Sequence, residues 1–510
     1  MSRPVLVAGA GPVGLTTALL LARWGVPTVV LEAAEGWEPT GSKSICVQRD
    51  VLDVYHRAGV ADALLAQGVT WHVGRTYYRG RELFTISFPD PGRSAYPGFI
   101  NVPQSTVERT LLAAVAAQPL VELRYGCAVT TLRQDDRSVT VDGGLTGSHL
   151  VAADGARSTV RDLLGLDFTG ESFDDPFLIA DIRADLPFGA ERRFHFDPQW
   201  NPGRQVLVHP QPDSVWRIDW QVPAGYDLGA DRASGGLDAR IRRITGPAPY
   251  QIVWLSVYRF HQRLAGRMRV GRVLLAGDAA HLMAPFGARG LNSGVQDAEN
   301  AAWKIAFDRR GWAGPGLLES YEVERRAAAE ENLRVTGETM RFLVPRSEAD
   351  RARRREILDR AVHDPSARGL VNSGKLAEPY WYVHSPLSTG EPPADFPTGP
   401  GHARPPVAGV LCPDGPTSLG GRRLRELFSG GFTVLGDGLD VTVPAASVPV
   451  RGYRLDRIDR DGVLAAALEA RPGQVRLVRP DGHLAALLSG PDELPDALRR
   501  ALGGTKPVDG

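Results

Sequence analysis

The sequence has very few cysteines and no long hydrophobic run. Its 510 residues include three cysteines, Cys46, Cys127 and Cys412, which lie far apart and form no CxxC pair. Such an odd, dispersed set supports neither a disulfide framework nor a zinc site. No apolar stretch approaches the roughly 20 residues that a helix needs to span a bilayer. The first predicted strand starts at Pro4, which leaves no room for a signal peptide, so we expect a reduced, cytoplasmic protein without metal.

Lysine is scarce as well, although the overall charge is balanced. Only four of the 59 basic residues are lysine, and 59 acidic residues bring the formal net charge to zero. A neutral chain gives no sign of binding nucleic acid or an anionic membrane. The hydrophobic fraction of 43% and the charged fraction of 23% are ordinary for a soluble globular protein. The length predicts about three domains with a large core.

The N-terminal stretch follows the order strand, glycine turn, helix, strand, acid. Apolar runs and helical spacing predict these elements at residues 4–8, 15–24 and 26–31. The turn is Gly9-x-Gly11-x-x-Gly14, and Glu32 follows the second strand. Gly9 allows a tight turn, Gly11 lets a pyrophosphate approach the backbone, and Gly14 lets the helix pack on the sheet. A carboxylate at the position of Glu32 accepts from ribose hydroxyls, so the unit predicts a dinucleotide site; the alternative is a plain turn.

Two polar residues in the next segments have two interpretations each. Lys43 lies in a loop after the second strand, where it either reaches cofactor phosphates or is simply solvated. Gln104 precedes a predicted helix over residues 105–117, and it either flanks that helix or faces a ligand.

A second motif follows the buried strand at residues 149–153. The strand ends in Asp154-Gly155, and Ser158 and Arg161 follow at three-residue steps. This spacing places the last two side chains near one helix face. Strand ends are where ligands sit in open α/β sheets, so the motif either binds a ligand or forms a capped strand–turn–helix corner.

A third motif follows the strand at residues 270–275. It begins with Gly277-Asp278 and continues with a glycine-containing loop from Pro285 to Asn292, before a helix at Val295. A glycine-rich loop that opens a helix is a ready site for an anion or oxyanion. The carboxylate of Asp278 could accept from a polyol.

The remaining sequence predicts two further units. Alternating strands between residues 175 and 261 predict an antiparallel sheet inserted between residues 1–175 and 262–385. A Pro- and Gly-rich stretch at residues 386–406 predicts a linker, and residues 407–510 predict a small α/β unit. The fold class expected from these patterns is α/β.

The three motifs in this order resemble the class A flavoprotein aromatic hydroxylases, the p-hydroxybenzoate hydroxylase-like family. The resemblance covers residues 1–345, and the tail is similar to the thioredoxin-like C-terminal domain of the phenol and polyketide hydroxylase branch. It implies a Rossmann-like FAD-binding domain, an inserted antiparallel-sheet substrate domain and a thioredoxin-like C-terminal domain. That last domain has no CxxC here, so no thiol redox chemistry is expected from it.

The resemblance also implies which residues act. Non-covalent FAD would be held by Gly9, Gly11, Pro12, Gly14, Glu32, Lys43, Gln104, Asp154, Gly155, Ser158, Arg161, Gly277, Asp278, Pro285, Gly290, Leu291 and Asn292. The loop residues Pro285, Gly287, Arg289 and Gly290 would lie beside the flavin and control oxygen chemistry. Arg289 either faces the flavin or lies on the surface. In place of Lys43 the family usually has arginine, which leaves the role of this residue open.

The activity that the resemblance implies is oxygen insertion into an aromatic ring. NADPH or NADH would reduce FAD, and a C4a-hydroperoxyflavin would hydroxylate a phenolic or polyketide-type small molecule in a monomer or homodimer. Substrate candidates on the sheet are His209, Trp216, Arg217, Asp219, Trp220 and Tyr258, each of which could instead be a surface or core residue. Alternatives are an epoxidase, a Baeyer–Villiger oxygenase or a silent flavin-binding protein. The halogenase signature WxWxIP is missing, since residues 216–223 are WRIDWQVP.

Overall fold

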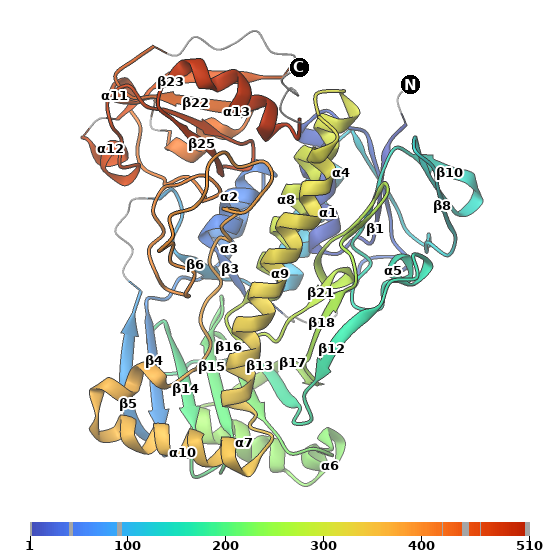
Figure 1. The fold of residues 1–510 in the computed structure, drawn as a ribbon. Coiled ribbons are helices and arrows are strands. Elements are labelled where there is room, and N and C mark those ends of the chain that lie inside the picture. The colour runs from blue at the N-terminus through green and yellow to red at the C-terminus, as the bar shows by residue number, and fades with distance from the viewer. Residues whose placement is uncertain are drawn as a thin grey trace.

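The computed structural model describes residues 3–39, 44–88, 94–420, 422–440, 448–459 and 461–504. Its three parts are an N-terminal α/β part in the middle, a sheet part at one end and the C-terminal unit at the other (Figure 1). The long helix α9 (Gly316–Leu343) runs along the molecule from the C-terminal unit to the sheet part (Figure 1). No helix of the described residues is long and apolar enough to cross a membrane.

The α/β part is built on a six-stranded sheet in the order β19-β20-β11-β1-β2-β7. Its strands are β1 (Val5–Ala8), β2 (Thr28–Leu31), β7 (Val121–Arg124), β11 (Leu150–Ala152), β19 (Arg269–Val270) and β20 (Val273–Leu275). All pairs are parallel except β19 with β20. The apolar runs of β1, β2, β11 and β20 are fully buried, as expected for parallel strands covered on both faces. Their carboxyl ends therefore bring the three sequence motifs to one edge.

Helices cover this sheet, and smaller strands complete the part. Helix α1 (Pro12–Arg23) packs on α8 (Arg289–Arg309) and on α4 (Gln104–Ala116). The other elements are β3 (Cys46–Gln48), α2 (Arg49–Arg57), α3 (Ala61–Gln67), β6 (Phe99–Asn101), β8 (Leu132–Gln134), β9 (Val139–Val141), β10 (Leu145–Gly147), α5 (Thr159–Leu163), β12 (Phe168–Ser172), β18 (His261–Ala265) and β21 (His281–Leu282).

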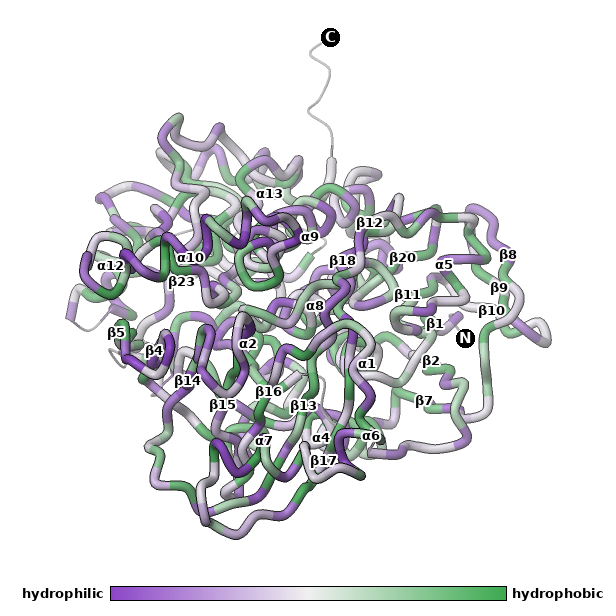
Figure 2. The backbone as a smooth tube through the Cα atoms, turned by 90° about the horizontal axis from the view of Figure 1, so that it is seen from below, coloured by the Kyte–Doolittle hydropathy of each residue, from purple (hydrophilic) through white to green (hydrophobic). Residues whose placement is uncertain are grey.

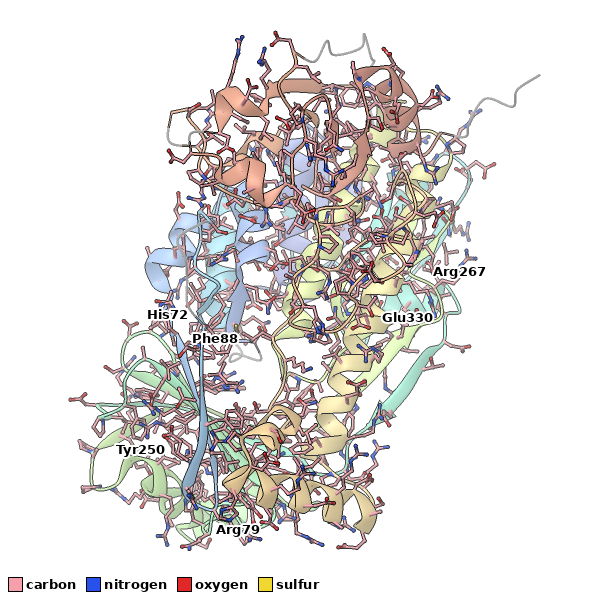
Figure 3. All side chains as sticks on the ribbon, turned by 60° about the vertical axis from the view of Figure 1, so that its left-hand side comes forward. His72, Arg79, Phe88, Tyr250, Arg267 and Glu330 are labelled. Atoms are coloured by element: carbon pink, nitrogen blue, oxygen red, sulfur yellow. The ribbon has the colours of Figure 1, made fainter. Side chains whose placement is uncertain are left out.

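The sheet part is a seven-stranded sheet in the order β17-β13-β16-β15-β14-β4-β5. Its strands are β4 (Val73–Tyr78), β5 (Arg81–Ser87), β13 (Phe177–Ala184), β14 (Glu191–Phe196), β15 (Gln205–Pro210), β16 (Val215–Gln221) and β17 (Tyr250–Tyr258). The first two come from the stretch that we assigned to the α/β part, so the sheet extends beyond residues 175–261. Figure 3 shows this hairpin leaving the α/β part at His72 and Phe88 and turning at Arg79.

The two faces of the seven-stranded sheet differ because side chains alternate along each strand. One face packs on α7 (Gly236–Thr245) through apolar residues such as Ile218 and Leu178, next to α6 (Leu228–Ala233). The other face turns toward the α/β part and the end of α9, where α10 (Glu348–His363) also packs. Polar and apolar residues are interspersed along these strands (Figure 2).

The C-terminal unit has a four-stranded sheet in the order β23-β22-β24-β25. Strands β22 (Phe432–Gly436) and β23 (Val450–Arg454) are parallel, whereas β24 (Val475–Val478) and β25 (Leu484–Leu488) join antiparallel. This is the strand arrangement of a thioredoxin-like domain, and the helices α11 (Leu455–Ile458), α12 (Val463–Ala467) and α13 (Leu494–Ala501) accompany it. Residues 386–406 contain no helix or strand, and Cys412 is a buried free thiol.

Candidate active site

A cavity of about 540 Å³ lies between the carboxyl edge of the six-stranded sheet and the inner face of the seven-stranded sheet. Its wall on the first side includes Gly11, Gly155 and Asp278, one residue from each sequence motif. Its wall on the second side includes Arg217 and Tyr258. One continuous space therefore joins the predicted dinucleotide site to the predicted substrate sheet.

The glycines of the first motif serve different purposes. A Cβ on Gly14 would lie 2.0 Å from the carbonyl oxygen of Gly9, and one on Gly9 would lie 2.4 Å from that of Ala153. These two glycines are needed by the chain itself, and Gly9 also has a φ of +95°. A Cβ on Gly11 would meet nothing within 4 Å, because Gly11 and Pro12 open onto the cavity at the start of α1. The structure thus leaves a cradle at the helix N-terminus, which fits a pyrophosphate.

Glu32 lies directly beside this cradle. Its carboxylate accepts hydrogen bonds from the backbone N–H of Ala10 at 2.7 Å and of Ala34 at 3.0 Å. These bonds fix the side chain at the end of β2, and a carboxylate keeps further lone pairs for a hydroxyl donor. The geometry fits the ribose role, although Glu32 is outside the cavity wall itself. Lys43 lies outside the described residues.

The side chains of the Asp154 motif form hydrogen bonds with one another and with the backbone of the same motif. Asp154 accepts from the hydroxyl of Ser158 at 2.6 Å and from the N–H of Val160 at 3.0 Å, while Ser158 caps α5 by accepting from the N–H of Arg161. The guanidinium of Arg161 is buried and donates to the carbonyl of Ala279 at 3.2 Å. The three side chains thus form the capped corner, and Gly155 of this motif lines the cavity; that the motif also holds FAD stays a prediction.

Gln104 and Asp278 are at the cavity, as the resemblance implied. The side-chain amide of Gln104 accepts from the N–H of Ser44 at 3.3 Å and donates to Glu108 at 2.8 Å. Asp278 is exposed in a short 3-10 turn, Gly277–Ala279, whose first N–H donates to the buried carboxylate of Asp297 at 2.9 Å. That buried bond fixes the backbone from which Asp278 projects, so its carboxylate can accept from a polyol in the cavity.

The loop before α8 forms the cavity wall opposite the sheet. Pro285, Gly287, Gly290 and Leu291 all line the space. Gly287 has a φ of +95°, and a Cβ there would lie 2.1 Å from the carbonyl oxygen of Lys375. A Cβ on Gly290 would meet nothing within 4 Å. The N-terminus of the 21-residue helix α8 therefore opens toward the cavity with its unpaired N–H groups and partial positive charge.

Arg289 lines the cavity, and both Arg289 and Asn292 make hydrogen bonds within the chain. The buried guanidinium of Arg289 donates to Asn332 at 2.6 Å and to the carbonyls of Lys375 and Leu376. It therefore anchors a neighbouring segment from the cavity wall, not from the surface, and its contact with the flavin stays a prediction. Asn292 accepts from the N–H of Gln48 at 3.0 Å and holds β3 against α8, and its contact with FAD stays a prediction.

The predicted substrate residues of the seven-stranded sheet fall on its two different faces. The side chains of His209, Arg217, Asp219 and Tyr258 line the cavity. Trp216 and Trp220 point to the opposite face of β16 and are buried in the core that includes α7. The two tryptophans are therefore removed from the substrate set, because residues one apart on a strand face opposite sides.

The charges on this face are unevenly paired. Arg217 makes two hydrogen bonds of 2.7 Å to the carboxylate of Asp181. Burial raises the pKa of Asp219 to about 7, because the charged form is costly away from water. Burial, with Arg192 and Arg217 nearby, lowers the pKa of His209 to about 3, so its imidazole is neutral.

Several cavity residues were not singled out by the sequence. They include Cys46, Trp71, Arg192, Trp254 and Ser373. Arg192 belongs to a run with strand-like alternation, which predicts the strand but does not say which face is buried against a ligand. Ser373 comes from a segment without regular structure, where no periodic signal exists.

Comparison with known proteins agrees with this arrangement. Residues 2–336 match the family described as "FAD binding domain". The chain belongs to this family. It is 32% identical to 6-methylpretetramide 4-monooxygenase of Streptomyces rimosus, over 94% of this chain and 90% of that protein.

Two further comparisons extend over nearly the whole chain. One is 12-dehydrotetracycline 5-monooxygenase/anhydrotetracycline 6-monooxygenase of Streptomyces rimosus, at 32% identity over 99% of both chains. The other is a crystal structure of the flavin-dependent monooxygenase PieE with FAD and substrate, with a TM-score of 0.83, 24% identity, and coverage of 98% of this chain and 99% of that one. The predicted fold class is confirmed, and the chain is an FAD-dependent aromatic monooxygenase of the class A flavoprotein type.

Proposed function

We propose that this enzyme uses NADPH or NADH as reductant and hydroxylates a phenolic, polyketide-type aromatic compound. The observation that carries the proposal is the single cavity of about 540 Å³ that joins the glycine cradle at Gly11 to the polar sheet face at Asp219. The two curated relatives that align over nearly the whole chain are named for 6-methylpretetramide and for 12-dehydrotetracycline and anhydrotetracycline, which supports a substrate of several fused rings. The proposal includes a cytoplasmic setting and a monomer or homodimer.

The chain would hold FAD at two helix N-termini. The pyrophosphate would lie at Gly11 and Pro12, and the flavin ring would lie against Gly290 and Leu291 at the start of α8. When bound and reduced, FAD supplies the activation of O2 and the transfer of one oxygen atom to the ring. The residues of the chain position the two partners and stabilise negative charge at the helix end.

Aromatic residues next to the flavin loop would keep water out. The rings of Phe177 and Phe286 lie 5.4 Å apart, and those of Phe260 and Phe286 lie 5.8 Å apart. All three line the cavity and are buried. Excluding water protects reactive oxygen species from loss and strengthens electrostatic contacts inside the site.

Asp219 would handle the proton of the substrate hydroxyl. Its carboxyl group lines the cavity, and among the described residues no side chain donates a hydrogen bond to it. With a pKa of about 7 it exchanges a proton readily near neutral pH. Drawing the proton from a phenol makes the ring more electron-rich, which favours attack on the oxygen that is transferred.

The test is NAD(P)H oxidation by the purified enzyme with and without phenols and fused-ring aromatic compounds. We expect a yellow protein whose NAD(P)H oxidation is stimulated by a fused-ring phenol, and a product heavier by one oxygen atom that derives from labelled O2. A Cβ at position 11 would meet nothing within 4 Å in the chain, so the variant Gly11→Val should fold but lose FAD. An FAD-loaded enzyme that no aromatic compound stimulates would contradict the proposal.

A further inference from the structure

Arg192 is a buried cation that faces the cavity from β14. Its side chain is 7% exposed and lines the cavity wall. It donates one hydrogen bond, of 3.0 Å, to the hydroxyl of Ser373. Its Nε has no hydrogen-bond partner among the described residues. The guanidinium thus has most of its donor capacity unused, although it is more than nine-tenths buried.

No anion of the described chain compensates this charge. Among the described residues, the thiol of Cys46 is the one group that would stabilise the positive charge of Arg192 if it were ionised. Burial raises the pKa of that thiol to about 12, so the thiol is neutral. His209 beside it is neutral as well, and burial lowers the pKa of Arg192 to about 10. The adjacent Glu191 is bound elsewhere, by Arg75 and Arg193.

Arg217 on the same sheet face shows what a compensated arginine looks like here. It is 3% exposed and is held by Asp181 through two hydrogen bonds of 2.7 Å. Buried charges in proteins are normally paired in this way, because an unpaired one is costly. Since two arginines at the same cavity differ so clearly, the missing partner of Arg192 is expected from outside the chain.

We propose that the aromatic substrate carries an acidic group with two coplanar oxygen atoms, which Arg192 binds with the help of Ser373. The inference rests on the proposed function and names the substrate class of the same site. A guanidinium presents parallel N–H donors that match a carboxylate or an ionised hydroxy-ketone. Trp71 and Cys46, which belong to one apolar cluster of the cavity wall, would pack beside the ring that carries this group.

The first test compares three naphthalene probes on the FAD-loaded enzyme. The probes are α-naphthol, its carboxylate 1-hydroxy-2-naphthoate and its ketone 2-acetyl-1-naphthol, and binding is followed by the flavin absorbance. We expect the wild type to bind at least one of the two oxygen-pair probes about tenfold or more tightly than α-naphthol. Comparing the carboxylate probe with the ketone probe then tells whether the oxygen pair belongs to a carboxylate or to a hydroxy-ketone.

In Arg192→Met the preference for the oxygen-pair probes should vanish, and in Arg192→Lys it should fall. Equal binding of all three probes by the wild type, no binding of either oxygen-pair probe, or a preference that survives in Arg192→Met would overturn the inference.

The second test needs no ligand. If Arg192 waits for an external anion, Arg192→Met should raise the melting temperature of the substrate-free holoenzyme by about 2 °C or more. The matched control Arg217→Met leaves Asp181 buried without its cation and should lower it. A loss in Arg192→Met as large as in Arg217→Met would mean that Arg192 is structural. Failure of the proposed function would appear differently, as wild-type enzyme whose NAD(P)H oxidation no aromatic compound stimulates.

Discussion

Two groups of buried charges in this molecule are built in opposite ways. At the junction of the C-terminal domain, Glu324 is fully buried and accepts from Lys304 at 2.6 Å and from both ends of the Arg479 fork. Asp481 accepts from Arg479 as well and from the indole N–H of Trp303. At the cavity, by contrast, neither Arg192 nor Asp219 forms an ion pair with another residue of the part of the chain that the structure describes, although Arg217 lies near Asp219. The charges at this junction are matched within the chain, whereas at the cavity Arg217 is matched by Asp181 but Arg192 and Asp219 are not matched in this way.

Breaking the matched group should have the largest effect. Glu324→Gln leaves Lys304 buried without its anion and removes one of the two carboxylates that hold Arg479. Because an uncompensated buried charge is costly, we expect a loss of about 3–5 kcal/mol in the free energy of unfolding, measured by urea denaturation. The exposed pair of Arg334 with Glu331 is the control, and Arg334→Met should cost less than about 1 kcal/mol. Equal losses of unfolding free energy in the two variants would mean that the buried charge group stabilises the fold no more than a surface ion pair does.

Asp219 provides a pH-dependent test at the unmatched group. Its pKa in the folded state, about 7, is raised above the ordinary value of 3.8. The group therefore favours the folded state fully at low pH, and this contribution is lost as the pH rises through about 7. Asp219→Asn should consequently gain stability over the wild type, on the order of a few kcal/mol, near pH 8 and little near pH 4. Thermal melts at both pH values measure the difference. A gain of equal size at both would contradict the raised pKa.

Within the glycine turn, one glycine is needed by the fold and another is left open for a ligand. Gly14→Ala should destabilise the fold by about 1–3 kcal/mol, because its Cβ would lie 2.0 Å from the carbonyl oxygen of Gly9. Gly11→Ala meets nothing within 4 Å in the chain, so its melting temperature without FAD should match the wild type while its FAD affinity falls. Melts of both apoproteins and a flavin titration separate the two effects. If Gly11→Ala unfolded as readily as Gly14→Ala, the cradle would not be a ligand site.

The smallest effect is expected in the C-terminal domain, at Cys412. Burial raises the pKa of its thiol to about 12, and it is one of the three free cysteines. A neutral, buried thiol has little reactivity, so Cys412→Ser should keep full turnover with at most a modest loss of stability. Steady-state rates and a thermal melt of the variant check this. A large loss of turnover in a folded variant would reopen a redox role.

The sequence predicted the fold and part of the site correctly where a local pattern has essentially one structural explanation. The buried parallel strands and the glycine turn predicted the α/β fold, because few other patterns join an all-apolar strand to such a turn. Gly11, Asp278 and Gly290 reach the cavity as the motif positions implied. Strand spacing also predicted a small α/β unit at the C-terminal end, whereas the linker at residues 386–406 stays a prediction.

The sequence was less informative for polar side chains with several possible partners. Asp154 and Arg161 stand where a ligand could lie, and in the fold they also bond to Ser158 and Ala279. A polar residue at a strand end does not reveal whether its partner is its own helix or a ligand. Alternation likewise separated the residues of β16 into two faces. It did not show that the face with Trp220 packs on α7 and that the other face lines the cavity. Arg192 could not be found, because the absence of a partner is visible only in the fold.

The central claim is that FAD and an aromatic substrate share one cavity, with the flavin ring against Gly290. The most direct measurement is the ratio of product formed to NAD(P)H consumed, in wild type and in Gly290→Val at equal FAD loading. A side chain there would enter the open space before α8, where pre-aligned donors are each worth about 2.7–4 kcal/mol. We expect near-normal FAD content, slower product formation and more NAD(P)H oxidised to peroxide per product. An unchanged ratio and rate would contradict it, because the loop at residues 285–292 would then not lie against the flavin.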